Sequence, residues 1–174
     1  QAARNNHGSW FAAQTGALAL YVGDTAIVRQ LVDEARPRIG AQIRPDGQQP
    51  IELERTRSFH YANFNVEALS RVAEIARALG TDLWTYQAPE GGSLRRAVDH
   101  LATHAPDQTS WPGKQIDRVD EDLLLLTFRR TQHALGTPAY AATIRALPAK
   151  LVREDRSALL WPDPAPNAVR NDGR

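Results

Sequence analysis

Two short clusters of the sequence carry the residue types needed for proton transfer beside a carboxylate. The first cluster, residues 4–10, reads Arg-Asn-Asn-His-Gly-Ser-Trp and offers amide and imidazole groups. The second cluster, residues 54–61, reads Glu-Arg-Thr-Arg-Ser-Phe-His-Tyr and offers two guanidinium groups, an imidazole and a phenol. Together they hold the groups required to remove a proton from a carbon beside a carboxylate and to protonate a leaving oxygen.

A proton alpha to a carboxylate, as at C5 of a uronic acid, is hard to remove because the carboxylate opposes a second negative charge. A site must neutralise that carboxylate, which amide and guanidinium groups do well. Histidine can donate a hydrogen bond or accept a proton near neutral pH. A tyrosine can act as base when nearby cations stabilise its phenolate, and it can then protonate the leaving oxygen. The candidates by residue type are Asn6, His7, Arg55 and Tyr61, with Asn5, Arg57 and His60 in reserve.

Each candidate also has a purely structural interpretation. The two asparagines precede an apolar run and fit a helix cap. The two arginines lie beside Glu52 and Glu54 and fit a surface ion-pair cluster. Tyr61, flanked by phenylalanines, fits core packing with its hydroxyl at the rim. Arg55 and Tyr61 are six residues apart, about 240° around a continuous helix, so both reach one cleft only if this segment is a helix start or an irregular turn.

Other aromatic and histidine residues are open to two readings or carry no signal. Trp10, Trp84 and Trp111 either stack on sugar rings or pack in the core. His100 and His104 have the spacing of metal ligands on a helix, but no suitable third ligand accompanies them. We therefore expect no metal and no other cofactor.

Length and composition narrow the class of protein. The 174 residues suffice for one domain with a real core. The net charge of +1 and the scattered basic residues favour neither a nucleic acid nor a membrane as partner. The absence of cysteine excludes disulfides and thiolate chemistry. No segment approaches the ~20 apolar residues of a membrane span. The chain starts without Met or a signal segment, so we expect preceding sequence to be missing.

The apolar residues recur every three to four positions almost throughout, which predicts helices and no strands. We expect Pro37 to kink or stop a second helix near Ala35, and Asn65 to cap a helix that ends at Gly80. The other expected helices cover 10–21, 93–104, 120–136, 138–147 and 148–160. This succession favours an all-α domain over residues 1–160, either an α/α solenoid or part of a helical toroid, and the lack of a fixed-period repeat argues against simple solenoids. Residues 161–174 are expected to form a surface tail.

The motif of residues 5–10, together with residues 52–61 and 65–69, resembles the alginate lyase superfamily of polysaccharide lyases. The resemblance covers about residues 1–135. It implies an α/α toroid with a groove for an anionic polysaccharide, of which this chain would be the C-terminal part. It also implies cofactor-free β-elimination at the 4-O-glycosidic bond of a uronate, with alginate as leading substrate, and a periplasmic or secreted location. The sequence carries no signal for an oligomeric state.

The resemblance also implies roles for individual residues. Asn6 would neutralise the substrate carboxylate, His7 would assist or act as base, and Tyr61 would protonate the leaving oxygen and serve as base in a syn geometry. The motif arginine matches Arg55, with Arg57 as second candidate; in some branches its position falls on Glu54. The expected substrate contacts are Asn5, Trp10, Arg57 and His60. The alternatives are a helical module that binds an anionic polysaccharide or a protein without catalysis, and a helical glycoside hydrolase, for which no convincing carboxylate pair is present.

Overall fold

A computed structural model describes residues 4–164, and this part of the chain folds into eight α-helices and two short 3-10 helices. Within the same range no strand forms, apart from an isolated antiparallel bridge between Arg57 and Gln115. The predicted all-α class is therefore confirmed. The elements are α1 (Asn6–Val22), α2 (Thr25–Gln42), α3 (Pro50–Leu53), α4 (Ser58–Ala78), α5 (Leu94–His104), η1 (Gln108–Ser110), α6 (Glu121–Leu135), α7 (Ala141–Ala146), α8 (Ala149–Glu154) and η2 (Arg156–Leu159).

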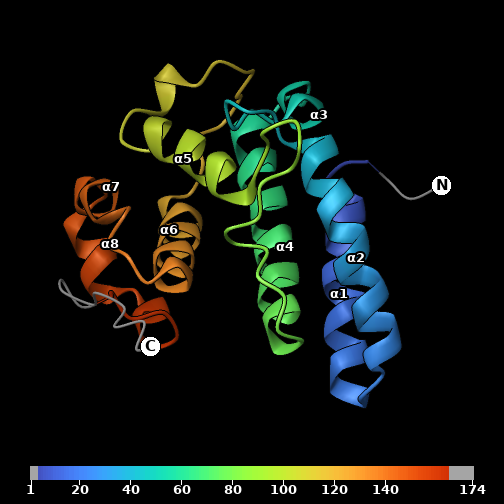
Figure 1. Cartoon of the computed structure of the whole chain (residues 1–174). Coiled ribbons are helices and arrows are strands. Elements are labelled where there is room, and N and C mark those ends of the chain that lie inside the picture. The colour runs from blue at the N-terminus through green and yellow to red at the C-terminus, as the bar shows by residue number, and fades with distance from the viewer. Residues whose placement is uncertain (1–3, 165–174) are drawn as a thin grey trace.

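Helix α4 is the central element of the fold (Figure 1). On one side of it lie α1 and α2, an antiparallel pair joined at Gly23, whose φ of 78° is a conformation that favours glycine. On the other side lie α5 and α6, with α7 and α8 beyond them. Helices α1 and α4 both begin at the upper end in Figure 1, where α3 also lies. The two sequence clusters, which lie at the starts of α1 and α4, are therefore brought to the same end of the molecule.

The core forms where α4 packs against its neighbours. Phe59, Val66 and Leu69 on α4 are buried, as are Leu124 and Phe128 on α6. Trp84 is fully buried and Trp111 is 7% exposed, so both tryptophans pack in the core. This removes the sugar-stacking interpretation for these two residues and leaves it open for the half-buried Trp10.

The predicted start of α4 is wrong, and of the two outcomes expected at Pro37 the helix stop does not occur. Helix α4 begins at Ser58, and Asn65 lies inside it with a fully buried side chain, because that side chain has hydrogen-bond partners on other elements. Helix α2 continues through Pro37 to Gln42, although proline removes one backbone hydrogen bond. Ile39 and Gln42, which follow the proline, are both buried, and their packing offsets this cost.

Several other boundaries agree with the sequence. The Ser93 side chain caps α5 by accepting a hydrogen bond from the Arg96 backbone N–H at 3.1 Å. Gly80 and Gly136 follow α4 and α6 with φ of 74° and 65°. The helix expected from Pro138 starts only at Ala141, as α7. Residues 138–140 form the turn before it.

The end of the described chain packs against the helices. Trp161, which the sequence places in a surface tail, donates a hydrogen bond from Nε1 to Glu74 Oε1 at 3.2 Å. The Arg130 guanidinium lies 4.4 Å from the Trp161 ring centroid. The packed part of the chain therefore extends at least to Trp161, while residues 165–174 of the predicted tail lie outside the described residues.

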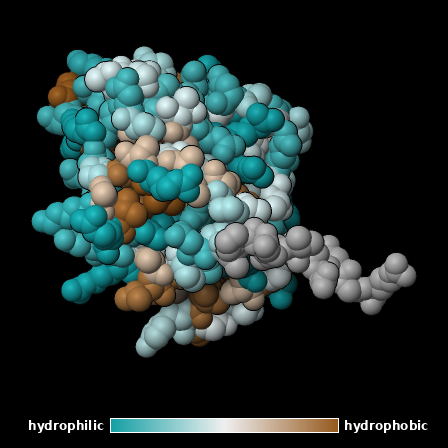
Figure 2. All heavy atoms as spheres, turned by 90° about the vertical axis from the view of Figure 1, so that its left-hand side faces the viewer, coloured by the Kyte–Doolittle hydropathy of each residue, from teal (hydrophilic) through white to brown (hydrophobic). Residues whose placement is uncertain are grey.

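Exposed apolar side chains occur on two parts of the surface. The face that carries α7 and α8 is mostly hydrophilic with a few apolar patches (Figure 2), and Leu159 and Leu160 of this C-terminal region are exposed. On the opposite side of the fold, Phe11, Leu18 and Tyr21 of α1 are exposed. Among residues 4–164, no helix combines the length and the apolar character that crossing a membrane would require.

Candidate active site

The first cluster forms the N-terminal end of α1. Asn5 is the cap: its side chain accepts a hydrogen bond from the His7 backbone N–H at 3.2 Å, and its carbonyl accepts one from Gly8 N at 3.0 Å. Asn6, the other asparagine that fitted a cap, lies inside the helix, and both Asn6 and Ser9 are buried. The cap fixes the first turn of α1, and the His7 side chain on this turn is exposed to solvent.

Asn6 is held by a buried carboxylate of α3. Its backbone N–H donates to Glu52 Oε1 at 2.7 Å, and its side-chain Nδ2 donates to Glu52 Oε2 at 2.8 Å. Asn6 is 0% exposed and Glu52 is 2% exposed. The Asn6 Oδ1 atom is buried without a hydrogen-bond partner among the described residues. The pair therefore fastens the first turn of α1 to the segment that leads into the second cluster.

Arg55 and Tyr61 lie on either side of the start of α4. Helix α3 ends at Leu53, residues 54–57 form a turn, and α4 begins at Ser58. Tyr61 lies in the first turn of α4, where its N–H donates to Arg57 O at 2.9 Å. The Arg55 guanidinium carbon lies 4.1 Å from the Tyr61 ring centroid. The helix start that the sequence required for these two residues to meet is therefore present.

Both side chains of this pair are half-exposed. Within residues 4–164, Arg55 makes no ion pair and the Tyr61 hydroxyl makes no hydrogen bond. The guanidinium and the phenol therefore remain available to a ligand.

A run of aromatic contacts joins the two clusters. The ring centroids of Tyr61 and His60 are 5.5 Å apart, and those of His60 and Phe64 are 5.9 Å apart. Phe64 in turn lies 4.8 Å from Trp10 on α1. The Arg71 guanidinium lies 5.4 Å from the Trp10 ring centroid. Phe64 is 36% exposed, so part of this run faces solvent beside Tyr61.

A buried amide network fixes the two helices beneath these residues. The Asn65 side chain donates from Nδ2 to Gln42 Oε1 at 2.9 Å and to Gln49 Oε1 at 2.7 Å. Ser9 Oγ donates to the same Gln42 oxygen at 3.1 Å, and Gln49 Nε2 donates to Ala62 O at 3.1 Å. The network links α1, α2, the start of α3 and α4. Buried amides that are paired in this way specify one arrangement of these elements.

Arg57 points to a different partner from the one expected. Its Nε lies 3.6 Å from Asp117 Oδ2, in the loop before α6. Glu52 pairs with Asn6 instead, so the predicted ion-pair cluster of the arginines with Glu52 and Glu54 does not form. Burial, and secondly the Arg57 charge, lowers the pKa of the neighbouring His60, although Asp120 opposes this in part. A neutral imidazole is therefore favoured beside Tyr61.

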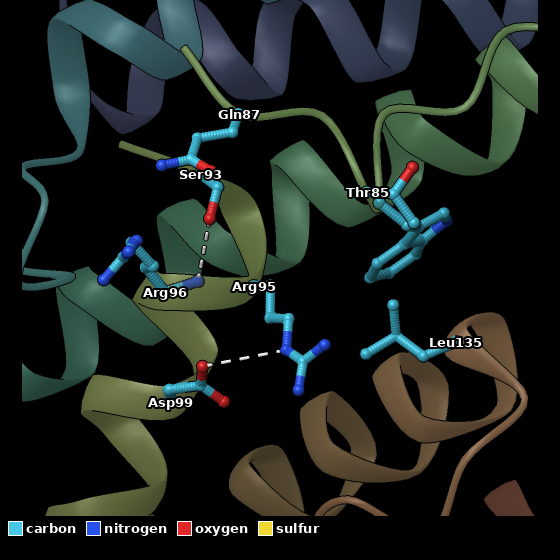
Figure 3. A pocket seen from close by; sticks show the side chains of 8 residues that line it. Thr85, Gln87, Ser93, Arg95, Arg96, Asp99 and Leu135 are labelled. Atoms are coloured by element: carbon cyan, nitrogen blue, oxygen red, sulfur yellow. Dashed lines mark hydrogen bonds and ion pairs between the residues drawn. The ribbon is translucent and has the colours of Figure 1, made fainter. Parts of the chain in front are cut away.

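The pocket of Figure 3 and two further histidines lie apart from the candidate catalytic residues, whereas a smaller cavity is lined in part by Trp10 and Arg71. Figure 3 shows a pocket of about 410 Å³ that includes Arg95, Arg96 and Asp99 of α5 and none of the predicted site residues. His100 and His104 pack their rings 5.1 Å and 5.3 Å from Trp111. Among the described side chains, no group of three or more potential ligands is arranged to hold a metal ion.

Two residues at the site are not among the candidates that the sequence predicts. Glu52 fitted a surface ion-pair cluster but binds Asn6 in the interior, and Gln115 Oε1 accepts a hydrogen bond from Phe59 N at 2.9 Å. One sequence signal for a distant cap exists. Arg57, the residue at the cap position of α4, is of a type that caps helices poorly. A helix that starts without its own cap needs acceptors from elsewhere in the chain.

Comparisons with known proteins show the family and the fold of the chain. A family model described as "Alginate lyase" matches residues 1–111, which include all of the predicted site residues. The structure also matches the crystal structure of an alginate lyase from Bacteroides ovatus, with a TM-score of 0.76 and 32% sequence identity. That match covers 82% of this chain and 39% of the other, so this chain spans well under half of that protein. A search of curated proteins finds no significant match. The predicted all-α, toroid-like helical domain is confirmed.

Proposed function

Because the chain belongs to the alginate lyase family, we propose that it carries the catalytic residues of a polysaccharide lyase that cleaves a uronic-acid polymer by β-elimination. Alginate is the first substrate to test, and other polyuronates come next. The observation that carries the proposal is the half-exposed pair of Arg55 and Tyr61, whose guanidinium carbon and ring centroid are 4.1 Å apart. The pair lies at the same end of the fold as His7.

The proposed reaction uses this pair in one elimination. A base takes the C5 proton, and the electron pair left on C5 forms the C4–C5 double bond. According to the C5 epimer, the base is neutral His7 or Tyr61 as its phenolate, which becomes the hydroxyl on taking the proton. The C4–O4 bond breaks, and the leaving O4 receives a proton from the Tyr61 hydroxyl. Arg55 supplies positive charge beside the phenol while negative charge develops on the substrate. The products are an unsaturated uronate and a shortened chain with a free hydroxyl.

The carboxylate of the substrate must be neutralised before C5 becomes acidic enough. Arg55 and His7 are exposed enough to donate to it directly. Asn6 donates one amide hydrogen to Glu52 and is fully buried. The role implied for Asn6, donation of its second amide hydrogen to the carboxylate, therefore requires the first turn of α1 to uncover this side chain. While Asn6 stays buried, its hydrogen bonds to Glu52 fix the first turn of α1 and thereby position His7.

Trp10 and His60, with Phe64 between them, complete the proposed binding surface. Sugar rings present apolar C–H faces, and the aromatic run beside Tyr61 offers matching surfaces. Asn5 and Arg57 are weaker candidates for substrate contact, because one caps α1 and the other faces Asp117. A polymeric substrate is met outside the cytoplasm, so a periplasmic or secreted location accompanies the proposal.

The decisive experiment is incubation of the 174-residue chain with alginate, glucuronan and other polyuronates while ultraviolet absorbance is recorded. Only elimination creates the conjugated C4–C5 double bond, so a steady rise in absorbance that is lost in Tyr61→Phe supports the proposal. Binding of the polymer without any rise would favour the alternative, a non-catalytic module for anionic polysaccharide. An increase in reducing ends without absorbance would indicate hydrolysis and would overturn the lyase assignment.

A further inference from the structure

The first turn of α4, which carries Tyr61, obtains its cap from a distant part of the chain. Arg57 at the cap position makes no side-chain hydrogen bond to the helix. Ser58 N donates instead to Lys114 O at 2.9 Å, and Phe59 N donates to the Gln115 side-chain oxygen at 2.9 Å. His60 N makes a longer contact of 3.5 Å with the same oxygen. The backbone donors that a helix start leaves open are thus satisfied from 55 or more residues away.

Residues 111–118, here called the capping segment, are anchored on both sides of this contact. The Trp111 ring stacks on Phe59 at 4.5 Å, and its Nε1 donates to Ser58 Oγ at 2.7 Å. Ile116 N donates to Thr56 O at 3.1 Å. A side chain at Gly113 would bring its Cβ within 2.3 Å of Ser58 Oγ, so the close approach requires glycine here. The Gln115 amide nitrogen donates back to Asp117 O and thereby orients its oxygen toward the helix.

We propose that Gln115 is a positioning residue for Tyr61: by capping α4 it holds the first turn, and with it the phenol, against Arg55. The effect on catalysis rests on the proposed function. The hold of Gln115 on the first turn of α4 rests on the structure alone. Gln115 lies beyond residue 111, where the family match ends. It is therefore a residue of the site that the family match does not cover.

The location of the cap predicts a specific effect on Tyr61 and not only a loss of fold stability. Tyr61 is only two residues beyond Phe59, so a loss of the cap frays the turn that carries the phenol. The groups offered to the substrate carboxylate, on His7 and Arg55, lie outside the first turn of α4, and the bond from Ile116 N to Thr56 O still holds the turn that carries Arg55, so we expect these groups to move less than the phenol. Displacement of a catalytic group by about 1 Å costs up to roughly a hundredfold in rate. We therefore expect Gln115→Ala to lower kcat between about tenfold and a hundredfold, and to change KM far less.

The test compares three variants of the whole chain. Gln115→Ala removes the acceptor, and Gln115→Glu keeps an acceptor oxygen at a helix start, where a negative charge is favourable. Ile116→Ala is the matched control, because this neighbouring side chain is exposed. Amide hydrogen exchange reports on the N–H groups of Phe59 and His60. NMR of chains labelled at tyrosine Cζ reports on Tyr61 among only four tyrosines.

The expected result is faster exchange at both amides, a shifted Tyr61 resonance and a reduced kcat in Gln115→Ala, with none of these changes in Ile116→Ala. Recovery in Gln115→Glu should be partial, because the carboxylate keeps the acceptor but loses the donor to Asp117 O. Unchanged exchange and an unchanged Tyr61 signal in Gln115→Ala would overturn the inference, whatever the activity. Altered signals with an unchanged kcat would also overturn it, because Tyr61 would then not need the cap. If the wild-type chain lacks lyase activity, the proposed function fails, while the exchange and NMR results still decide whether Gln115 positions Tyr61.

Discussion

The guanidinium carbon of Arg55 lies 4.1 Å from the centroid of the Tyr61 ring, although the two residues belong to different local structures. Arg55 belongs to the turn after α3, and Tyr61 belongs to the first turn of α4. A cation over an aromatic ring is attracted by the ring's electrons and is a fixed positive charge beside the phenol. The contact therefore orders the two side chains and places a positive charge beside the phenol.

Removal of the phenolic hydroxyl should abolish elimination while leaving the fold intact. We expect Tyr61→Phe to reduce kcat by at least about a hundredfold, because general acid–base groups contribute factors of this size. The Tyr61 hydroxyl has no hydrogen-bond partner among the described residues, so stability should change by less than about 0.5 kcal/mol. Ultraviolet absorbance measures the rate, and thermal unfolding measures the stability. Tyr21→Phe, at an exposed position on the far end of α1, is the control; retained activity in Tyr61→Phe would refute the acid assignment.

The two arginines of the second cluster should behave differently when replaced. Arg55→Lys keeps the charge but loses the planar fork that lies over the ring, so we expect a loss of activity of about tenfold or more. Arg57→Lys should have a smaller effect, because Arg57 faces Asp117 in a half-exposed pair of low energetic weight. Steady-state kinetics of both variants under one set of salt conditions decide the matter. A larger loss in Arg57→Lys would transfer the motif role to Arg57.

The buried pair of Asn6 and Glu52 predicts a stability effect. Glu52→Gln keeps one acceptor oxygen but turns an amide group toward an Asn6 donor, which leaves a buried donor unpaired. We expect a loss of about 1–3 kcal/mol in the free energy of unfolding, together with reduced activity as His7 loses its support. Glu54→Gln, at an exposed neighbouring position, should change stability by less than about 0.5 kcal/mol. Denaturant midpoints of the two variants test this, and equal midpoints would show that the pair contributes nothing.

Much of the helical fold could be predicted from local signals. The apolar spacing of α4 and α6, the Ser93 cap of α5 and the glycine ends at Gly80 and Gly136 are all written in short stretches of sequence. The errors arose where distant residues decide the outcome. Asn65 has the type of a cap, but Gln42 and Gln49 offer it acceptors inside the core.

The candidate site shows the same division. The sequence identified the two clusters and required a helix start between Arg55 and Tyr61, because spacing and residue type are local properties. It did not identify Glu52 as the partner of Asn6, since a contact over 46 residues leaves no periodic signal. Nor did it single out Gln115, which caps a helix 56 residues before it. Such residues are placed by the tertiary fold, and a single sequence does not encode them as a pattern.

The buried amide network around Asn65 should tolerate loss of the amide better than its conversion to a charge. Asn65→Ala leaves Gln42 and Gln49 short of a donor, with an expected cost of about 1–3 kcal/mol. Asn65→Asp turns a buried carboxylate toward two amide oxygens, and we expect a larger loss because an unpaired buried charge costs more than a missing hydrogen bond. Denaturant unfolding of the two variants ranks them. The reverse order would mean that the network rearranges around the new group.

The histidines predict how stability depends on pH. Burial is the main cause that lowers the pKa of His60, His100 and His104. At His60 the charge of Arg57 lowers the pKa further and Asp120 opposes this in part. At His100 the charge of His104 lowers the pKa further and Asp46 opposes this in part. Below the unfolded value of about 6.5, the unfolded chain therefore binds protons that the folded chain refuses. Stability must then fall as pH falls from about 7 toward 5, because stability rises with pH wherever the unfolded state binds more protons.

The pH range for this measurement follows from the carboxylates. Burial raises the pKa of Asp82, but hydrogen bonds and the nearby Arg77 outweigh it and lower the pKa. Hydrogen bonds with Thr109 and, more weakly, the charge of Arg118 lower the pKa of Asp107 against a small opposing effect of burial. The contribution of both groups is therefore lost only near and below the usual values of about 4. Unfolding free energies between about pH 5 and pH 7.5 therefore isolate the histidines. The double variant His100→Gln/His104→Gln should show a shallower slope over this range, whereas His133→Gln, at an exposed position, should follow the unaltered chain. A double variant with an unchanged slope would mean that these imidazoles are protonated equally easily in the folded and unfolded chains.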